Sequence, residues 1–148
     1  MPNDLYKTLI QALHDRLGDR AGTYALPPPV FVTVQGEFVR LDLDAGLLTA
    51  RFPVLDGYLN PYHSMQGIMI AAAVDNTLGP LSMLVAPPNV TLRLEMTYSR
   101  PAPAEIGYIL VEAKRVEREG RWLRFQATVR DPEEQRLARR KATHWIID

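Results

Sequence analysis

Cysteine is absent from this chain of 148 residues. Its absence excludes disulfide bonds, thiolate catalysis and cysteine-based metal sites, and it fits a protein of the reducing cytoplasm. A surplus of charge is also missing, because 17 lysine and arginine residues balance 17 aspartate and glutamate residues. The chain therefore lacks the positive field that attracts nucleic acids or anionic membranes, and we expect it to bind neither.

A long uninterrupted apolar run is missing as well. Charged residues break up the N-terminal segment, so no signal-peptide core is present, and no run approaches the roughly 20 apolar residues of a membrane span. Hydrophobic residues nevertheless make up 47% of the chain, which is enough to form a core. We therefore expect one soluble domain over residues 1–148, located in the cytoplasm.

The spacing of apolar residues predicts most of the secondary structure. Leucine and isoleucine recur at helical intervals over residues 4–17, with Asn3 as a cap and Gly18 as a stop. A proline-rich bend follows at residues 27–29. Alternating apolar and polar residues then predict strands at 38–43, 47–54, 90–98, 107–118, 121–130 and 136–147.

A second helix is predicted over residues 66–78, where apolar side chains occupy every side, as in a helix buried by its surroundings. Gly79 and Pro80 are expected to kink or end it. The order is one helix, two strands, the buried helix and four strands. This order predicts an α+β fold in which an antiparallel sheet of five to six strands wraps around the central helix.

One carboxylate, Asp75, stands inside this apolar helix. An ionised carboxylate is costly to bury without partners, so its position indicates a function. A structural alternative is that Asp75 pairs with an arginine of a neighbouring strand. The segment at the start of the helix supplies Asn60, Gln66 and Gly67, which could hold a carbonyl group or a water molecule.

The segments NPYHSMQGIMIAAAVDNTLG (60–79) and NVTLRLEMTYSRPAP (89–103) resemble hotdog-fold acyl-CoA thioesterases of the phenylacetate-degradation (PaaI-like) type. In that group the start of the helix typically reads NPxGxxHGG and an aspartate follows in the helix. Asn60 and Pro61 match this pattern, as do Gly67 and Asp75. Two residues depart from it, because Gln66 stands at the histidine and Ile68 replaces the second glycine.

The resemblance implies the hotdog fold and the hydrolysis of an acyl thioester to a carboxylic acid and a free thiol. It implies no cofactor besides the coenzyme A of the substrate, and the thioester could be carried by coenzyme A or by an acyl carrier protein. It also implies a homodimer or homotetramer in which two central helices run antiparallel across a shared sheet. Three scattered histidines show no metal-ligand spacing, so we expect no metal.

Helix geometry gives an independent reason to expect a dimer. Gly67 and Asp75 are eight residues apart, which separates them by about 12 Å along one helix. Chemistry at a thioester needs an oxyanion donor and a base or nucleophile within about 3 to 4 Å of the same carbon. Asp75 should therefore meet Gly67 of a second chain.

Each candidate residue has an expected role. The N–H of Gly67, at the positive end of the helix, would stabilise the oxyanion, while Asp75 would activate water or attack the thioester directly. By the resemblance, Asn60 would orient the water or thioester, although it could be only a turn residue. Gln66 could donate to the carbonyl, but it cannot act as a cation or shuttle protons.

Other residues could contact the substrate. By the resemblance Thr91 would help hold the water, yet strict alternation in strand 90–98 places it off the apolar face. His63 could supply an imidazole after a local shift, and Ile68 could narrow the path of the acyl group or pantetheine arm. Five arginines could contact the phosphates of coenzyme A, although they could also be solvated strand residues: Arg100, Arg118, Arg121, Arg139 and Arg140. Three methionines could line an acyl pocket, although core packing explains them as well: Met65, Met69 and Met83.

Two other function classes stay open. Gln66 and Ile68 depart from the usual helix start, which favours a non-catalytic protein that binds acyl thioesters. A hotdog enoyl thioester hydratase or dehydratase would pair a histidine with a carboxylate, and His63 is the residue available for that role.

Overall fold

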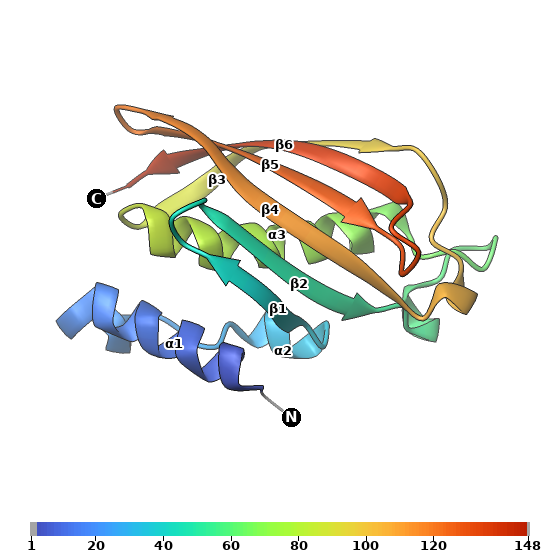
Figure 1. The fold of residues 1–148 in the computed structure, drawn as a ribbon, viewed down its shortest axis with the longest axis horizontal. Helices are drawn as coiled ribbons and strands as arrows, with labels where there is room; N and C mark the ends of the chain where they lie inside the picture. Colours follow the sequence, from blue (N-terminus) through green and yellow to red (C-terminus); the bar gives the residue numbers. More distant parts are fainter. Residues whose placement is uncertain (1–2, 148) are drawn as a thin grey trace.

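A six-stranded antiparallel sheet curves around one long helix, α3 (Gly67–Val85), and a second helix, α1 (Asp4–Leu17), lies along the open side (Figure 1). The computed structural model describes residues 3–147. The order of the strands across the sheet is β1 (Glu37–Asp42), β2 (Leu47–Pro53), β4 (Tyr108–Glu119), β5 (Trp122–Arg130), β6 (Arg136–Ile146) and β3 (Asn89–Tyr98). The architecture predicted from the sequence is therefore confirmed.

The strands follow the predicted ranges because alternation marks which side chains face the helix. In β5, Leu123, Phe125, Ala127 and Val129 are buried, while most of the residues between them are exposed. Hydrophobic side chains of this face pack against α3 and form the core with it. Burial of one face sets the register of each strand, since a slip of one residue would turn every apolar side chain outward.

Helix α3 is longer than the sequence predicts. It continues through Gly79 and Pro80 to Val85, so the expected end near residue 78 is wrong. Proline removes one backbone hydrogen bond, but the last turns bury Leu81 and Leu84, and the Ser82 hydroxyl donates to the Gly79 carbonyl at 2.7 Å. By length and composition alone this helix could span a membrane, and more than half of that window is buried inside the protein.

The N-terminal helix α1 is capped as predicted. Asn3 Oδ1 accepts from the Tyr6 N–H at 2.8 Å, and Gly18 ends the helix with φ 57° while its N–H bonds to the His14 carbonyl. Asn3 Nδ2 also donates to the Phe38 carbonyl at 2.8 Å, which ties α1 to β1. The proline-rich segment is more regular than expected, because it begins a short helix, α2 (Pro29–Thr33), with Pro29 at its first position.

Strand β3 forms one edge of the sheet and contains a bulge. The register against β6 shifts between Thr91 and Arg93, so Leu92 has no direct partner. Thr91 pairs with His144 before the bulge, and Met96 pairs with Arg140 after it; both of these β6 side chains are buried. The predicted uninterrupted alternation of β3 is therefore wrong, and Thr91 faces inward.

Candidate active site

Asp75 lies in the middle of α3 and faces strands β3 and β6. Its side chain is 52% exposed in a single chain, although the helix around it is largely buried as expected. The Thr91 hydroxyl donates to Asp75 Oδ1 at 3.3 Å. The bulge in β3 creates this contact, because an uninterrupted strand would have turned Thr91 to the outer face. The structure thus brings two of the predicted site residues together.

A buried histidine extends this contact into the sheet. His144 Nε2 lies 3.4 Å from Thr91 Oγ1, and His144 Nδ1 lies 2.8 Å from Asn89 Oδ1. The Asn89 amide nitrogen donates to the Ser82 and Pro87 carbonyls, so its oxygen faces the ring as an acceptor. The ring therefore donates from Nδ1 and presents the lone pair of Nε2 to Thr91.

The proton on the Thr91 hydroxyl thus has two acceptors, Asp75 Oδ1 and His144 Nε2. Burial lowers the pKa of His144 to about 4, which outweighs the opposite effect of the Asp75 charge, so the ring is neutral at neutral pH. Asn89 and His144 hold Thr91 in place beside the carboxylate. Sequence reasoning did not give His144 a role.

The low pKa of His144 predicts a loss of stability in acid. An unfolded chain protonates this ring near pH 6.5, whereas the folded chain resists protonation down to about pH 4. The unfolded state therefore binds more protons in this window, and the free energy of unfolding should fall by about 3 kcal/mol as the pH drops from 7 to 4. Chemical unfolding of the native chain and of His144→Gln across this range measures the difference.

His14→Gln, at an exposed position of α1, is the matched control and should follow the native chain. If His144→Gln and the native chain lose the same stability between pH 7 and 4, the ring does not titrate as described.

Arg140 lies beneath Asp75 and is a second residue that sequence reasoning misjudged. Its side chain is 0% exposed, and its Nη2 lies 3.9 Å from Asp75 Oδ1. Among the described residues, none of its side-chain nitrogens has a hydrogen-bond partner. Burial lowers the pKa of Arg140 to about 10, against the opposing charge of Asp75, so the group stays cationic at neutral pH.

The alternative that Asp75 pairs with an arginine of a neighbouring strand is therefore observed in part, as a contact with Arg140. The distance of 3.9 Å exceeds a hydrogen bond, so the guanidinium supplies a nearby positive charge without capping the carboxylate. The expectation that Arg140 is a solvated residue or a phosphate contact is wrong. Asp75 is left with one face toward Thr91 and Arg140 and another open to solvent.

The start of α3 forms a different part of the candidate site. Gln66 is the N-cap and makes no capping hydrogen bond with its side chain, so the first amides of the helix, beginning with Gly67, have no side-chain cap. The Tyr98 hydroxyl donates to the Gly67 carbonyl at 2.5 Å. A Cβ atom at Gly67 would lie 3.1 Å from Tyr98 Cζ, so glycine allows the tyrosine to approach this closely.

An open hollow of about 340 Å³ adjoins this helix start and is lined by Asn60, Gly67, Tyr98 and Arg100 among others. Asn60 Oδ1 accepts from the backbone N–H groups of Tyr62 and Ser64, at 2.9 and 3.1 Å. Asn60 therefore stabilises the turn, as the turn alternative expects. The amide nitrogen of Asn60 is its remaining polar group. Arg100 Nη1 donates to Gln135 Oε1 at 2.8 Å, which holds its guanidinium against the segment just before β6.

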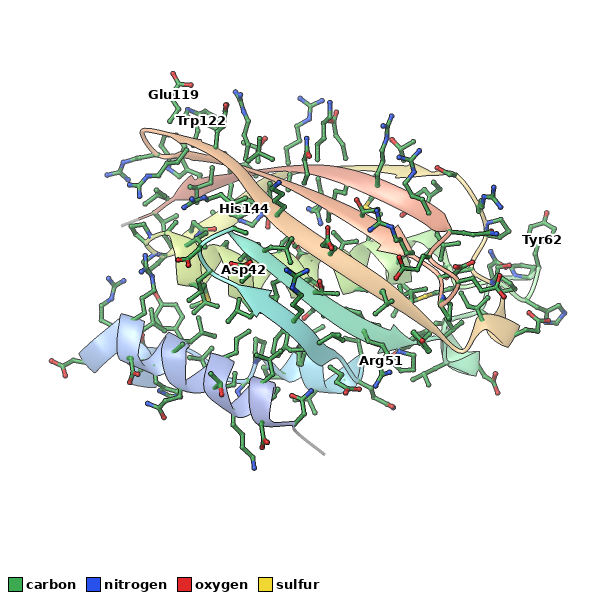
Figure 2. The ribbon with its side chains drawn as sticks, in the orientation of Figure 1. Asp42, Arg51, Tyr62, Glu119, Trp122 and His144 are labelled. Atoms are coloured by element: carbon green, nitrogen blue, oxygen red, sulfur yellow. The ribbon has the colours of Figure 1, made fainter. Side chains whose placement is uncertain are left out.

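The remaining predicted residues, at and just before the start of α3, are exposed. His63 has φ 61° in the exposed loop before α3, next to Tyr62, whose side chain projects into solvent (Figure 2). Ile68 is 68% exposed, so in a single chain it narrows no path. Gln66 is also exposed. The hollow beside Gly67 does not include Asp75, and α3 separates the two residues by about 12 Å.

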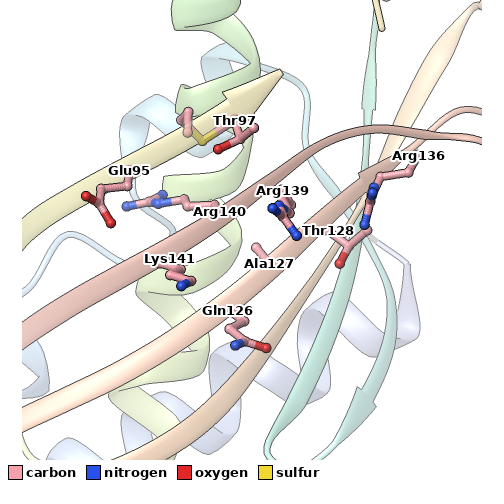
Figure 3. Close-up of a pocket in the computed structure, with 10 residues that line it drawn as sticks. Glu95, Thr97, Gln126, Ala127, Thr128, Arg136, Arg139, Arg140 and Lys141 are labelled. Atoms are coloured by element: carbon pink, nitrogen blue, oxygen red, sulfur yellow. The ribbon is translucent and has the colours of Figure 1, made fainter. Parts of the chain in front are cut away.

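A larger hollow, of about 630 Å³, lies elsewhere (Figure 3). Arg139 and Lys141 of β6 line it together with residues of β3 and β5 that pair with them across the sheet, such as Thr97 and Gln126. These exposed side chains belong to the outer face of the sheet, and neither Gly67 nor Asp75 takes part. Within residues 3–147 no cluster of histidine, aspartate and glutamate side chains could hold a metal ion.

Comparison with solved structures supports the resemblance. The chain is 25% identical, with a TM-score of 0.78, to a candidate thioesterase of Ralstonia eutropha, a phenylacetic acid degradation-related protein, over 91% of this chain and 98% of that one. It also matches the PaaI protein of the E. coli phenylacetic acid degradation operon, with 13% identity, a TM-score of 0.77 and coverage of 92% and 96%.

A third similar structure is a Streptococcus mutans protein bound to acetyl-CoA, with 21% identity, a TM-score of 0.69 and coverage of 75% of this chain and 87% of that one. No protein-family model and no curated protein sequence matches the chain. The similarity therefore confirms the hotdog fold and the structural resemblance to PaaI-like proteins.

Proposed function

We propose that this protein is an acyl-CoA thioesterase that hydrolyses an acyl thioester to a carboxylic acid and a free thiol. The observation that carries the proposal is the exposed Asp75 carboxylate, which Thr91 contacts beside a buried cation. The hotdog fold, the candidate thioesterase of similar structure and the acetyl-CoA-bound neighbour support the same reaction class. Coenzyme A enters as part of the substrate.

The reaction needs both parts of the site on one carbonyl group. Asp75 of one chain takes a proton from water as the water oxygen attacks the thioester carbon, and the first amides of α3 of the second chain, at Gly67, stabilise the oxyanion. The intermediate collapses, the carbon–sulfur bond breaks and the thiolate leaves and takes up a proton. Direct attack by Asp75 would instead give an anhydride, which water then cleaves.

Strand β3 supplies the surface for the second chain. It is an edge strand, and its apolar side chains Val90, Leu92, Leu94 and Tyr98 are exposed in one protomer. An apolar edge with unpaired backbone groups favours pairing with another strand. We propose that two β3 edges pair antiparallel in a dimer, because this arrangement brings α3 of one chain alongside α3 of the other in the opposite direction.

A charge on this edge should weaken the dimer. Leu92 lies at the β3 bulge and is 53% exposed, so Leu92→Lys introduces a charge that pairing would have to bury. We expect self-association to weaken by at least about tenfold, with a parallel loss of activity at low protein concentration. Sedimentation over a range of concentrations measures this.

Val116→Lys is a matched control, since Val116 lies at the bulge of the internal strand β4 and is 49% exposed. It should associate like the native chain. If the native chain, Leu92→Lys and Val116→Lys all associate equally, the β3 edge is not the interface.

The test of the proposed function is a thiol-release assay over acyl-CoA thioesters of different length and over the same acyl groups on an acyl carrier protein. Steady turnover of at least one thioester supports hydrolysis. Saturable binding with no release of thiol or acid from any thioester would instead support the binding-protein alternative, which the exposed Gln66 in place of histidine favours. Among residues 3–147, Asp75 contacts Thr91 and Arg140 and forms no hydrogen bond or ion pair with His63, so the geometry does not support the role of His63 in the hydratase alternative.

A further inference from the structure

A small cavity lies between α1 and α3, with Asp75 at its edge. Its volume is about 110 Å³. Leu9, Ile10 and Leu13 of α1 contribute to one wall, and the opposite wall is α3 from Asp75 to Met83. In Figure 1 α3 lies behind the strands and α1 lies along the lower edge of the view, and the two helices contact each other. The cavity is therefore closed by the N-terminal helix and not by the sheet alone.

The lining is apolar except at one end. Among the described residues that line the cavity, Asp75 is the one that carries a charge. The neighbouring Asn76 side chain is occupied, because its amide nitrogen donates to the Ala72 carbonyl at 2.8 Å. Gly79 adds free space, since a Cβ atom there would meet no atom within 4 Å. An apolar cavity lined by Asp75 at one end matches an apolar chain whose reacting carbonyl lies near Asp75.

The opposite side of Asp75 offers no such space. Arg140 is fully buried there without a hydrogen-bond partner among the described residues, and His144, also buried, lies further along the same strand. An apolar chain against that guanidinium would leave the buried cation without a hydrogen-bond partner, which is costly. An acyl chain attached to a carbonyl at Asp75 is therefore directed toward α1.

We propose that this cavity holds the acyl group of the thioester and that α1 sets the upper limit of its length. The proposal rests on the proposed function, since it takes Asp75 as the group beside the reacting carbonyl. A volume of 110 Å³ is somewhat smaller than a cavity of about 150 Å³ that admits benzene, and it accommodates about four methylene-sized groups. The preferred substrates are thus thioesters of short apolar acids, and long-chain acyl groups are excluded.

Variants of Ile10 test this directly, because its side chain lines the cavity and is only partly buried. Ile10→Ala enlarges the cavity, and Ile10→Trp fills it. We expect Ile10→Ala to move the optimum of kcat/KM toward acyl chains about two carbons longer, with about a fourfold gain for each added methylene that becomes buried. We expect Ile10→Trp to lower kcat/KM for butanoyl-CoA at least about tenfold and for acetyl-CoA much less.

Gln11→Ala and Gln11→Trp are matched controls on the exposed side of α1 and should keep the native length profile. Met83→Phe, from the α3 wall, should act like Ile10→Trp and keeps the test decisive if one variant fails to fold. Each chain is assayed over acyl-CoA thioesters from two to sixteen carbons. An unchanged length profile in all cavity variants, with turnover intact, overturns the acyl-pocket proposal while leaving the thioesterase proposal in place.

Calorimetric binding of the same thioesters separates the two proposals further. It is measured on Asp75→Asn and on Asp75→Asn combined with each Ile10 variant. If no thioester is hydrolysed by the native chain but binding still follows acyl length and shifts with Ile10, the pocket is correct and the hydrolase assignment fails. Neither binding nor turnover with any thioester would overturn both.

Discussion

Replacing Asp75 with asparagine is expected to lower kcat for thioester hydrolysis by about a thousandfold. The amide keeps the size of the side chain and can still contact Thr91, but it cannot take a proton from water or form an anhydride. KM should change little, because the reacting group contributes mainly in the transition state. Steady-state kinetics of the native chain and of Asp75→Asn on the best thioester of the screen measure both constants.

Loss of the charge at Asp75 also leaves Arg140 without its nearby anion, so a fall in activity has to be separated from unfolding. Thermal unfolding of Asp75→Asn provides that check, and Asp75→Glu retains the charge. Asp56→Asn, an exposed carboxylate in the short helix before the site, is the control and should be fully active. Folded Asp75→Asn with native kcat would exclude a role for this carboxylate in the reaction.

The fold could be predicted because each element carries its own signal. Alternation gave the strands, and their turns contain residues suited to them, such as Gly120 with φ 58° between β4 and β5. The length of α3 could not be predicted from local signals, since Gly79 and Pro80 normally end a helix. Burial of the turns beyond Pro80 outweighs that local preference, and burial depends on the sheet that surrounds them.

The candidate site was only partly predictable for a related reason. Asp75 stands out in an apolar helix, but the position of Thr91 depends on one bulge that the regular alternation of β3 conceals. A signal for Arg140 and His144 did exist in the sequence. Both share the inward positions of β6 with Ala142 and Ile146, so two polar side chains interrupt an apolar face. Buried polar residues on such a face point to a site beneath the helix.

The need for a second chain is the part of the site that geometry predicts most directly, because the rise of an α-helix is fixed. Nothing in α3 allows Gly67 and Asp75 of one chain to reach the same carbonyl, and α3 is unbroken between them. The sharing of the site between two chains can be tested with any one thioester that the protein hydrolyses. The test requires two variants that each damage a different half of the site.

Gly67→Val is the partner variant to Asp75→Asn. Its side chain would collide with the Tyr98 ring, which already lies 3.1 Å from a hypothetical Cβ, and would displace the helix start from the oxyanion. When subunits of the two inactive variants are exchanged in equal amounts, half of the dimers are mixed and each contains one intact site. Activity should therefore recover to about a quarter of the native value. Each variant treated alone should stay inactive.

The reverse mixture distinguishes a site shared between chains from one contained in a single chain. Native subunits are exchanged with a double variant, Asp75→Asn with Gly67→Val. In a shared site both pockets of every mixed dimer contain one damaged half, so the activity of the native subunits should fall to about half. If both groups act within one chain, the native subunit keeps its pocket in the mixed dimer and no activity is lost. Subunit exchange confirmed by native mass spectrometry makes either result decisive, since an unmixed sample would show the same constant activity.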